Sequence, residues 1–137
     1  MRSLRIGGMI AALLGGLALA SGAAEPGRAK AKSPCLGTVR HVVLFQFKDG
    51  TKPEEIRKIE DAFRALPAKI PQIVGFEWGT NISPENKADG FTHCFFLTFK
   101  DVKDRDAYLP HPAHKAFGAV LRPSLKKVLV IDYVAKE

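Results

Sequence analysis

The stretch AYLPHPAHKAFG, residues 107–118, places a tyrosine and two histidines within a few positions of one another, ahead of a short apolar run. A neutral imidazole at His114 can remove an acidic C–H proton, and the hydroxyl of Tyr108 can stabilise the oxyanion that then develops. This pair suits proton transfer beside a carbonyl group. The alternative is that Tyr108 is a core aromatic and His114 a buried hydrogen-bonding residue, and we favour the chemical interpretation.

The prolines of the same stretch indicate a structural role for the third polar residue. Pro110 and Pro112 restrict the backbone and cannot continue a helix, so one short helix should end near Tyr108 and another should start near Pro112. His111 is then expected to be a helix cap or an exposed turn residue. A metal site on His111 and His114 is disfavoured because the stretch holds no Asp, Glu or Cys to complete it.

Other catalytic signatures are missing from the sequence. It has no G-x-S-x-G motif, no phosphate-binding glycine loop, no C-x-x-C motif and no pair of carboxylates in an apolar setting. We therefore expect no metal and no organic cofactor.

The first 24 residues are typical of a signal peptide. Arg2 and Arg5 precede an uncharged apolar run from Ile6 to Ala20, and Ala18-Leu19-Ala20 or Gly22-Ala23-Ala24 offers a small-residue cleavage site. A membrane anchor is the weaker alternative because this run is short for a bilayer span and contains four glycines. We expect an exported protein, periplasmic or secreted, with no stable membrane insertion after cleavage.

Residues 25–38 have the composition of a disordered linker, with almost no large apolar side chain. Leader and linker also hold most of the excess positive charge, since 16 basic and 13 acidic residues remain from position 39 onward. A nucleic-acid partner is therefore not expected. Cys35 and Cys94 should lie at opposite ends of the sheet, about 30 Å apart, too far to pair within one chain. We expect Cys35 to be exposed and Cys94 to be a small core residue.

The domain from residue 39 to residue 137 shows alternating strand and helix patterns. Strands are predicted at 39–48, 72–82, 91–100 and 126–134 from β-branched and aromatic runs. A capping box at Thr51–Glu54 should start an amphipathic helix that Pro67 ends, Asp101 should cap a short helix reaching Tyr108, and a further helix should span 113–122. The order strand, helix, strand, strand, helix, strand predicts an α+β, ferredoxin-like split βαβ fold with a four-stranded antiparallel sheet.

Both faces of this predicted sheet are apolar. In the first strand Val43 and Phe45 belong to one face and Val42 and Leu44 to the other, and the last strand is apolar in both phases as well. The two helices of this topology cover one face only. The open face needs a partner, for which a second copy of the chain is the simplest choice, so we expect a homodimer.

The sequence also resembles the stress-responsive α/β-barrel (Dabb) domain family. The resemblance rests on RHVVLFQFKDG, GFEWGTNIS, ADGFTHCFFLTFKD, YLPHPAHKAFG and VLVIDY, and it covers essentially residues 39–135. It implies a dimeric α+β barrel with a pocket in each subunit between sheet and helices. Within the family the pattern is similar to that of a plant polyketide cyclase that needs no metal or cofactor.

The resemblance also implies site residues. The catalytic tyrosine and histidine of that cyclase fall on Tyr108 and His114. Two further pocket histidines fall on His41 and His93, although each is more simply interpreted as a core histidine with a backbone partner. The implied apolar pocket wall consists of Val43, Phe45, Phe95, Leu97, Val128 and Val130.

Two functions of different class follow. The first is an exported dimeric protein that binds a small hydrophobic or phenolic ligand within each subunit, in a stress-response role. The second is a cofactor-independent cyclase, lyase or isomerase in which Tyr108 and His114 transfer protons beside a carbonyl.

Overall fold

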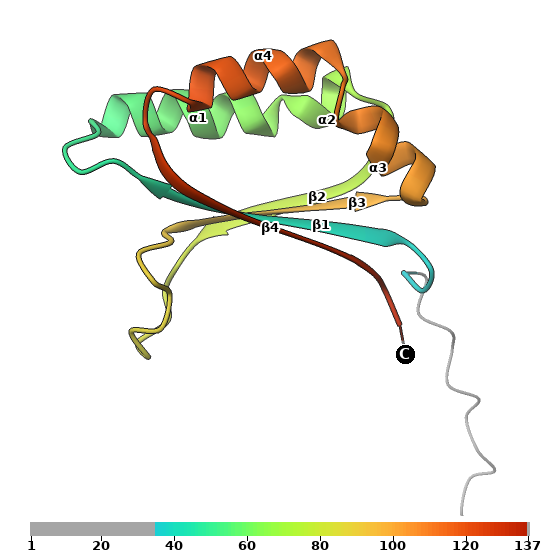
Figure 1. Ribbon diagram of the computed structural model, residues 1–137, viewed down its shortest axis with the longest axis horizontal. Helices are drawn as coiled ribbons and strands as arrows, with labels where there is room; N and C mark the ends of the chain where they lie inside the picture. Colours follow the sequence, from blue (N-terminus) through green and yellow to red (C-terminus); the bar gives the residue numbers. More distant parts are fainter. Residues whose placement is uncertain (1–34, 137) are drawn as a thin grey trace, which may run out of the picture. The chain divides into compact units, whose positions relative to one another are not determined.

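The structure is a computed structural model that describes residues 35–136. The expected signal peptide and residues 25–34 of the expected linker lie outside the described residues. Figure 1 shows the elements of the described part in chain order. They are β1 (Val39–Phe47), α1 (Pro53–Arg64), α2 (Leu66–Lys69), β2 (Ile73–Thr80), β3 (His93–Phe99), α3 (Val102–Tyr108), α4 (Pro112–Leu121) and β4 (Leu125–Val134).

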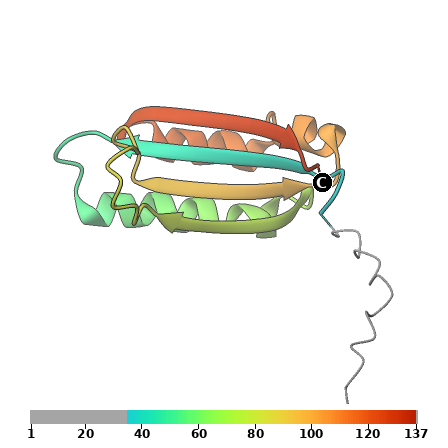
Figure 2. The ribbon, with the colours of Figure 1, turned by 90° about the horizontal axis from the view of Figure 1, so that it is seen from below.

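The four strands form one sheet in the order β2-β3-β1-β4, and every neighbouring pair is antiparallel. The helices lie on one face of this sheet (Figure 1). The opposite face, seen from below in Figure 2, is crossed by no helix of residues 35–136. This arrangement confirms the predicted ferredoxin-like split βαβ fold.

Alternation along the strands produces the core. Every second residue of β1, from Val39 to Phe47, is buried beneath the helices, and β3 alternates in the same way. Aromatic rings fill the space between sheet and helices, where Phe63 of α1 stacks on Phe95 of β3 at 4.1 Å between ring centroids. The buried apolar residues are Val39, Val43, Phe45, Phe47, Ile59, Phe63, Leu66, Ile70, Ile73, Phe95, Leu97, Phe99, Tyr108, Phe117 and Leu121.

The other phase of the strands forms the open face. Leu44 lies between Cys94 and Leu129 in the register, and Val42 lies between Phe96 and Ile131. Leu129 is 40% exposed, and its neighbours on β4 are similarly exposed. The apolar members of the open face are Val42, Leu44, Phe96, Leu129, Ile131 and Tyr133.

The cysteines lie toward opposite ends of the sheet, as expected, but their burial differs from the prediction. Cys94 is a partly buried residue of the open face rather than a core residue, because its phase is that of Leu44 and not that of Phe95. Cys35 is half-buried rather than exposed, because it belongs to a turn in which Gly37 donates to the carbonyl of Ala135. Both are free thiols in the described part of the chain.

Two helix boundaries differ from the predictions. The N-cap of α1 is Lys52, whose backbone N–H donates to Glu55, while the hydroxyl of Thr51 donates to the carbonyl of Lys48. Pro67 does not end the helical segment but lies in the first turn of α2, where its missing N–H costs no hydrogen bond.

Candidate functional site

A cavity of about 220 Å³ lies between the β1–β4 side of the sheet and helices α3 and α4. Its wall is apolar except at one end, where three polar side chains meet. The polar lining is His41, Tyr108 and His114, and the remaining lining is Val43, Phe45, Phe63, Leu109, Phe117, Gly118, Leu121, Leu125, Val128 and Val130.

Tyr108, the last residue of α3, is 1% exposed. Its ring packs against Phe99, His41 and His114, the last at 4.3 Å between centroids. Burial and, to a lesser extent, the charge of Asp132 raise the pKa of the Tyr108 hydroxyl. The phenol therefore stays protonated at neutral pH and can donate a hydrogen bond to a bound molecule.

His114 lies one turn into α4, and its Nδ1 atom is 2.9 Å from the carbonyl oxygen of Leu109. A carbonyl only accepts, so Nδ1 carries a proton and Nε2 is the acceptor when the ring is neutral. The helix itself starts at His111, whose Nδ1 accepts from the backbone N–H of Ala113. This confirms the interpretation of His111 as a cap.

His41 of β1 is buried and hydrogen-bonded to a carboxylate. The register places it opposite Asp132 of β4, and the distance from Nδ1 to Oδ1 is 2.6 Å. Arg105 of α3 binds the second oxygen of Asp132. Burial lowers the pKa of His41, and the hydrogen bond to Asp132 opposes that effect only in part.

Asp132 and Arg105 are functional candidates that sequence reasoning missed. The signal for Asp132 was an acidic residue in the phase of Val128 and Val130 within an apolar strand. Arg105 carried no signal because its partner lies 27 residues away in sequence. His41 was expected to bond to a backbone group, but its partner is the carboxylate of Asp132.

Three residues implied for the pocket lie elsewhere. His93 is at the far end of β3, between Glu60 of α1 (Nε2 to Oε1, 3.0 Å) and the hydroxyl of Thr92 (2.8 Å from Nδ1). Phe95 and Leu97 are fully buried core residues. The reason is that β3 lies on the other side of β1 from β4, under α1 rather than under α4.

The structure brings the other implied residues together, and helices add to them. Tyr108, His114, His41, Val43, Phe45, Val128 and Val130 all line the cavity. From α4 the cavity also takes Phe117 and Leu121, whereas Ala116 and Val120 on the same helix are exposed.

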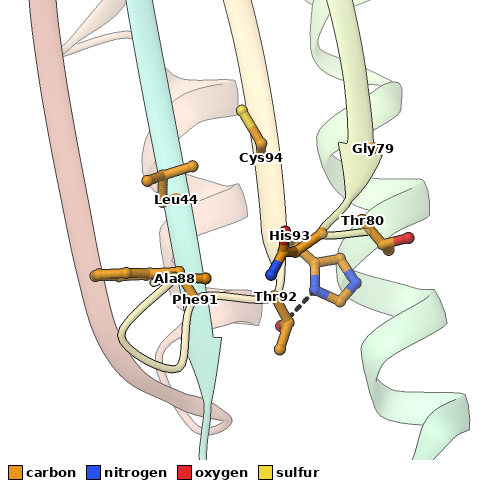
Figure 3. Close-up of a pocket in the computed structure, with 9 residues that line it drawn as sticks. Leu44, Gly79, Thr80, Ala88, Phe91, Thr92, His93 and Cys94 are labelled. Carbon is orange, nitrogen blue, oxygen red and sulfur yellow. Dashed lines mark hydrogen bonds between the residues drawn. The ribbon is translucent and has the colours of Figure 1, made fainter. Parts of the chain in front are cut away.

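A second pocket of about 300 Å³ lies on the open face, next to the loop that joins β2 and β3. Figure 3 shows Leu44 and Cys94 on neighbouring strands, and Phe91, Thr92 and Ala88 at the loop. The hydrogen bond between Thr92 and His93 is drawn there, with the imidazole pointing away from Leu44. This pocket is separate from the cavity that holds Tyr108.

Residues 35–136 contain no group of three or more His, Cys, Asp or Glu side chains with the geometry to hold a metal ion. Within the same residues no helix has the length and apolar character needed to cross a bilayer.

Comparison with known families identifies the domain. The sequence pattern of the stress responsive A/B barrel domain matches residues 39–135. The chain belongs to the Dabb family. The matched segment contains the whole sheet, all four helices and the cavity.

Two relatives and one solved structure show what Dabb proteins include. The stress-response A/B barrel domain-containing protein HS1 of Arabidopsis thaliana is 42% identical over 97 residues, 71% of this chain and 89% of HS1. Olivetolic acid cyclase of Cannabis sativa is 31% identical over 99 residues, 72% of this chain and 98% of the cyclase. A dimeric protein of unknown function with a ferredoxin-like fold from Bacteroides fragilis matches with a TM-score of 0.60 and 31% identity, over 72% of this chain and 97% of that one.

Proposed function

We propose that this Dabb protein is a homodimer that binds a small, mainly apolar molecule with a phenol or carbonyl group in the cavity of each subunit. The observation that carries the proposal is the cavity itself, apolar on most sides with Tyr108, His114 and His41 together at one end. Sites of this kind orient a small molecule by its polar end and hold the rest by contact.

The size of the cavity limits the ligand. At about 220 Å³ it is smaller than the range of about 300–1,000 Å³ typical of drug-sized ligands. It suits a single ring with a short chain, or two fused rings. Val128 and Val130 line it and are 46% and 49% exposed, so the ligand would enter beside β4.

The dimer is supported by the open face of the sheet. Apolar surface remains exposed to solvent at Leu129, Ile131 and Tyr133. The same patch on a second copy of the chain can cover it. The Bacteroides fragilis relative, which has the same fold, is dimeric.

A binding experiment with 2-naphthol, a fluorescent phenol of suitable size, tests the ligand proposal. Gly118 lines the cavity and a Cβ there would meet no neighbouring side chain within 4 Å, so Gly118→Leu should occupy part of the cavity. We expect at least a tenfold loss of affinity in Gly118→Leu. Ala119→Leu, an exposed neighbour on the same helix, is the matched control and should bind as the wild type does. Equal binding by both variants would place the phenol outside this cavity.

A second function, cofactor-independent cyclisation or lysis, is favoured by the convergence of Tyr108 with two imidazoles. An imidazole would remove a proton beside a carbonyl, and the Tyr108 hydroxyl would stabilise the oxyanion. The sequence favours His114 as that imidazole, and one relative is named as a cyclase. Tyr108→Phe and the double variant His41→Gln/His114→Gln, which removes both cavity imidazoles, should lose turnover while the dimer is kept. Unchanged turnover in both variants would restrict the protein to the binding function.

Export in a stress-response role completes the proposal. It is supported by the basic and apolar composition of residues 1–24 and by the stress-response name of the family. N-terminal sequencing of the protein from its native host should find a mature chain that starts between residues 21 and 25. Recovery of Met1 and Arg2 in the mature protein would refute export by cleavage.

A further inference from the structure

Two histidines face the cavity, and the structure distinguishes them by what lies behind each ring. We propose that His41, held by Asp132, is the group that accepts a proton from the bound molecule, with Asp132 and Arg105 as positioning residues. The inference rests on the proposed cavity function and assigns the proton acceptor within it. His114 then contacts the ligand without taking the proton.

The tautomer of His41 leaves one ring nitrogen able to accept a proton. A carboxylate accepts hydrogen bonds, so the contact of 2.6 Å with Asp132 puts the ring proton on Nδ1 and leaves the lone pair on Nε2. Nε2 has no hydrogen-bond partner within residues 35–136. Among residues 35–136, Oε1 of Gln72 is the one side-chain N or O atom that is both fully buried and without a partner. Nε2 of His41 has no partner and is not such an atom, so it is not fully buried. Because His41 lines the cavity and is only 4% exposed, this atom is reached from the cavity.

The two histidines differ in the charge that lies behind each ring. When an imidazole takes a proton it becomes cationic, and a carboxylate on its far nitrogen stabilises that cation. Asp132 provides this carboxylate for His41, whereas His114 has only the neutral carbonyl of Leu109. Asp132 thus favours the protonated form of His41 and offsets part of the effect of burial, which lowers the pKa of the ring.

The two histidines also differ in how rigidly each ring is held. His41 is held in the central strand β1, and Asp132 in the adjacent strand directly opposite it. Arg105 binds the other oxygen of Asp132, so the carboxylate is fixed at both ends. His114 lies on α4 and is partly exposed. The aligned group is therefore the one in the sheet.

The charged and titratable groups facing His41 come from three elements: Asp132 from β4, Arg105 and Tyr108 from α3, and His114 from α4. Burial lowers the pKa of His41, so the ring is neutral and able to accept a proton at neutral pH. Tyr108 packs edge-on against His41 at 5.6 Å between ring centroids. A proton acceptor and a hydroxyl donor thus lie side by side at the polar end of the cavity.

The Kemp elimination of 5-nitrobenzisoxazole tests this assignment without knowledge of the natural ligand. A base removes the proton on C3, the ring N–O bond breaks, and its electron pair ends on the oxygen of 2-cyano-4-nitrophenolate. The proton then passes from His41 to water. No oxidant, reductant or cofactor takes part, and the Tyr108 hydroxyl can donate to the phenolate oxygen as it forms.

We expect the wild type to catalyse this elimination, and His41→Gln to lose about 100-fold or more of kcat/KM. Asp132→Asn should lose about tenfold and move the inflection of the pH–rate profile to lower pH, because the stabilising charge on the imidazolium is gone. His114→Gln should lose much less than His41→Gln. The matched control is Glu60→Gln, which alters the second His–carboxylate pair, whose two residues do not line the cavity, and it should leave the rate unchanged.

Imidazole ¹H–¹⁵N NMR of the unliganded wild type tests the same claim without any probe. It should show a neutral His41 with its proton on Nδ1 at neutral pH, a signal that a merely structural histidine bonded through Nε2 would not give. The opposite tautomer, or a rate that falls in His114→Gln and not in His41→Gln, would overturn the inference. Binding of 2-naphthol without any elimination also overturns the assignment of His41 but leaves the ligand proposal standing. If the protein neither binds 2-naphthol nor catalyses the elimination, both proposals are refuted.

Discussion

Tyr108 is 1% exposed and lines the cavity, and its hydroxyl has no hydrogen-bond partner within residues 35–136. Tyr108→Phe therefore leaves no protein group unsatisfied, and the free energy of unfolding should change by less than about 1 kcal/mol. Affinity for 2-naphthol should fall, because the donor to its oxygen is lost. Urea unfolding and fluorescence titration of the same sample measure the two effects. A large loss of stability with unchanged affinity would make Tyr108 a core residue only.

His41 should make stability depend on pH. Its folded pKa lies below the ordinary value of 6.5, so between these two values the unfolded chain binds more protons than the folded one. The contribution of His41 to the free energy of unfolding should therefore be fully present above pH 6.5. It should be lost as the pH falls from 6.5 toward the folded pKa, by at most ~1.4 kcal/mol per pH unit. Urea unfolding of the wild type and His41→Gln between pH 7.5 and 5.5 measures this. An equal slope in both would remove His41 as the cause.

The candidate site could be predicted in part at this scale. Tyr108 and His114 were accessible because they share one short stretch with a distinctive spacing. The contacts of Asp132 with His41 and Arg105 could not be predicted from the sequence. They depend on the pairing of β1 with β4 and on the direction of α3, and no local pattern indicates either. His93 was placed in the pocket by resemblance, but it lies on β3, where it bonds to Glu60 of α1 and does not line the cavity.

At the scale of elements, α4 depends on its cap. His111 satisfies the N–H of Ala113, so His111→Ala should reduce the free energy of unfolding by about 1 kcal/mol. His111→Asn, which restores a capping acceptor, should recover most of it. Because α4 carries His114, the alanine variant should also weaken 2-naphthol binding. Urea unfolding of the three proteins decides the matter, and equal stability would show that the cap contributes nothing.

The elements themselves followed from the sequence because each has its own local signal. Alternating apolar residues predicted the four strands within one or two residues, and the prolines separated α3 from α4 correctly. Pro67 was misjudged because a proline is equally compatible with the end of one helix and the first turn of the next. Cys94 was misjudged because β3 is apolar in both phases, so its pattern does not say which face is the core.

At the scale of the whole molecule, the open face of the sheet should decide the oligomeric state. Leu129→Lys places a charge in the middle of this face and should give a monomer or an insoluble chain. Val120→Lys is the matched control, since Val120 is 46% exposed on the helix side, and it should remain dimeric. Light scattering at micromolar concentration distinguishes the two. A monomeric wild type would show that the face needs no partner.

Gly118 on the cavity wall leaves room for a ligand but lowers the stability of helix α4. Glycine within a helix costs about 1 kcal/mol relative to alanine, and here a methyl group would meet no atom within 4 Å. Gly118→Ala should thus raise the free energy of unfolding by about 0.5–1 kcal/mol in urea titrations while reducing the room for a ligand. A chain selected for durability alone would gain from alanine at this position. Evolution of a new specificity in this fold could therefore begin with one methyl group at position 118, which would exclude the largest ligands.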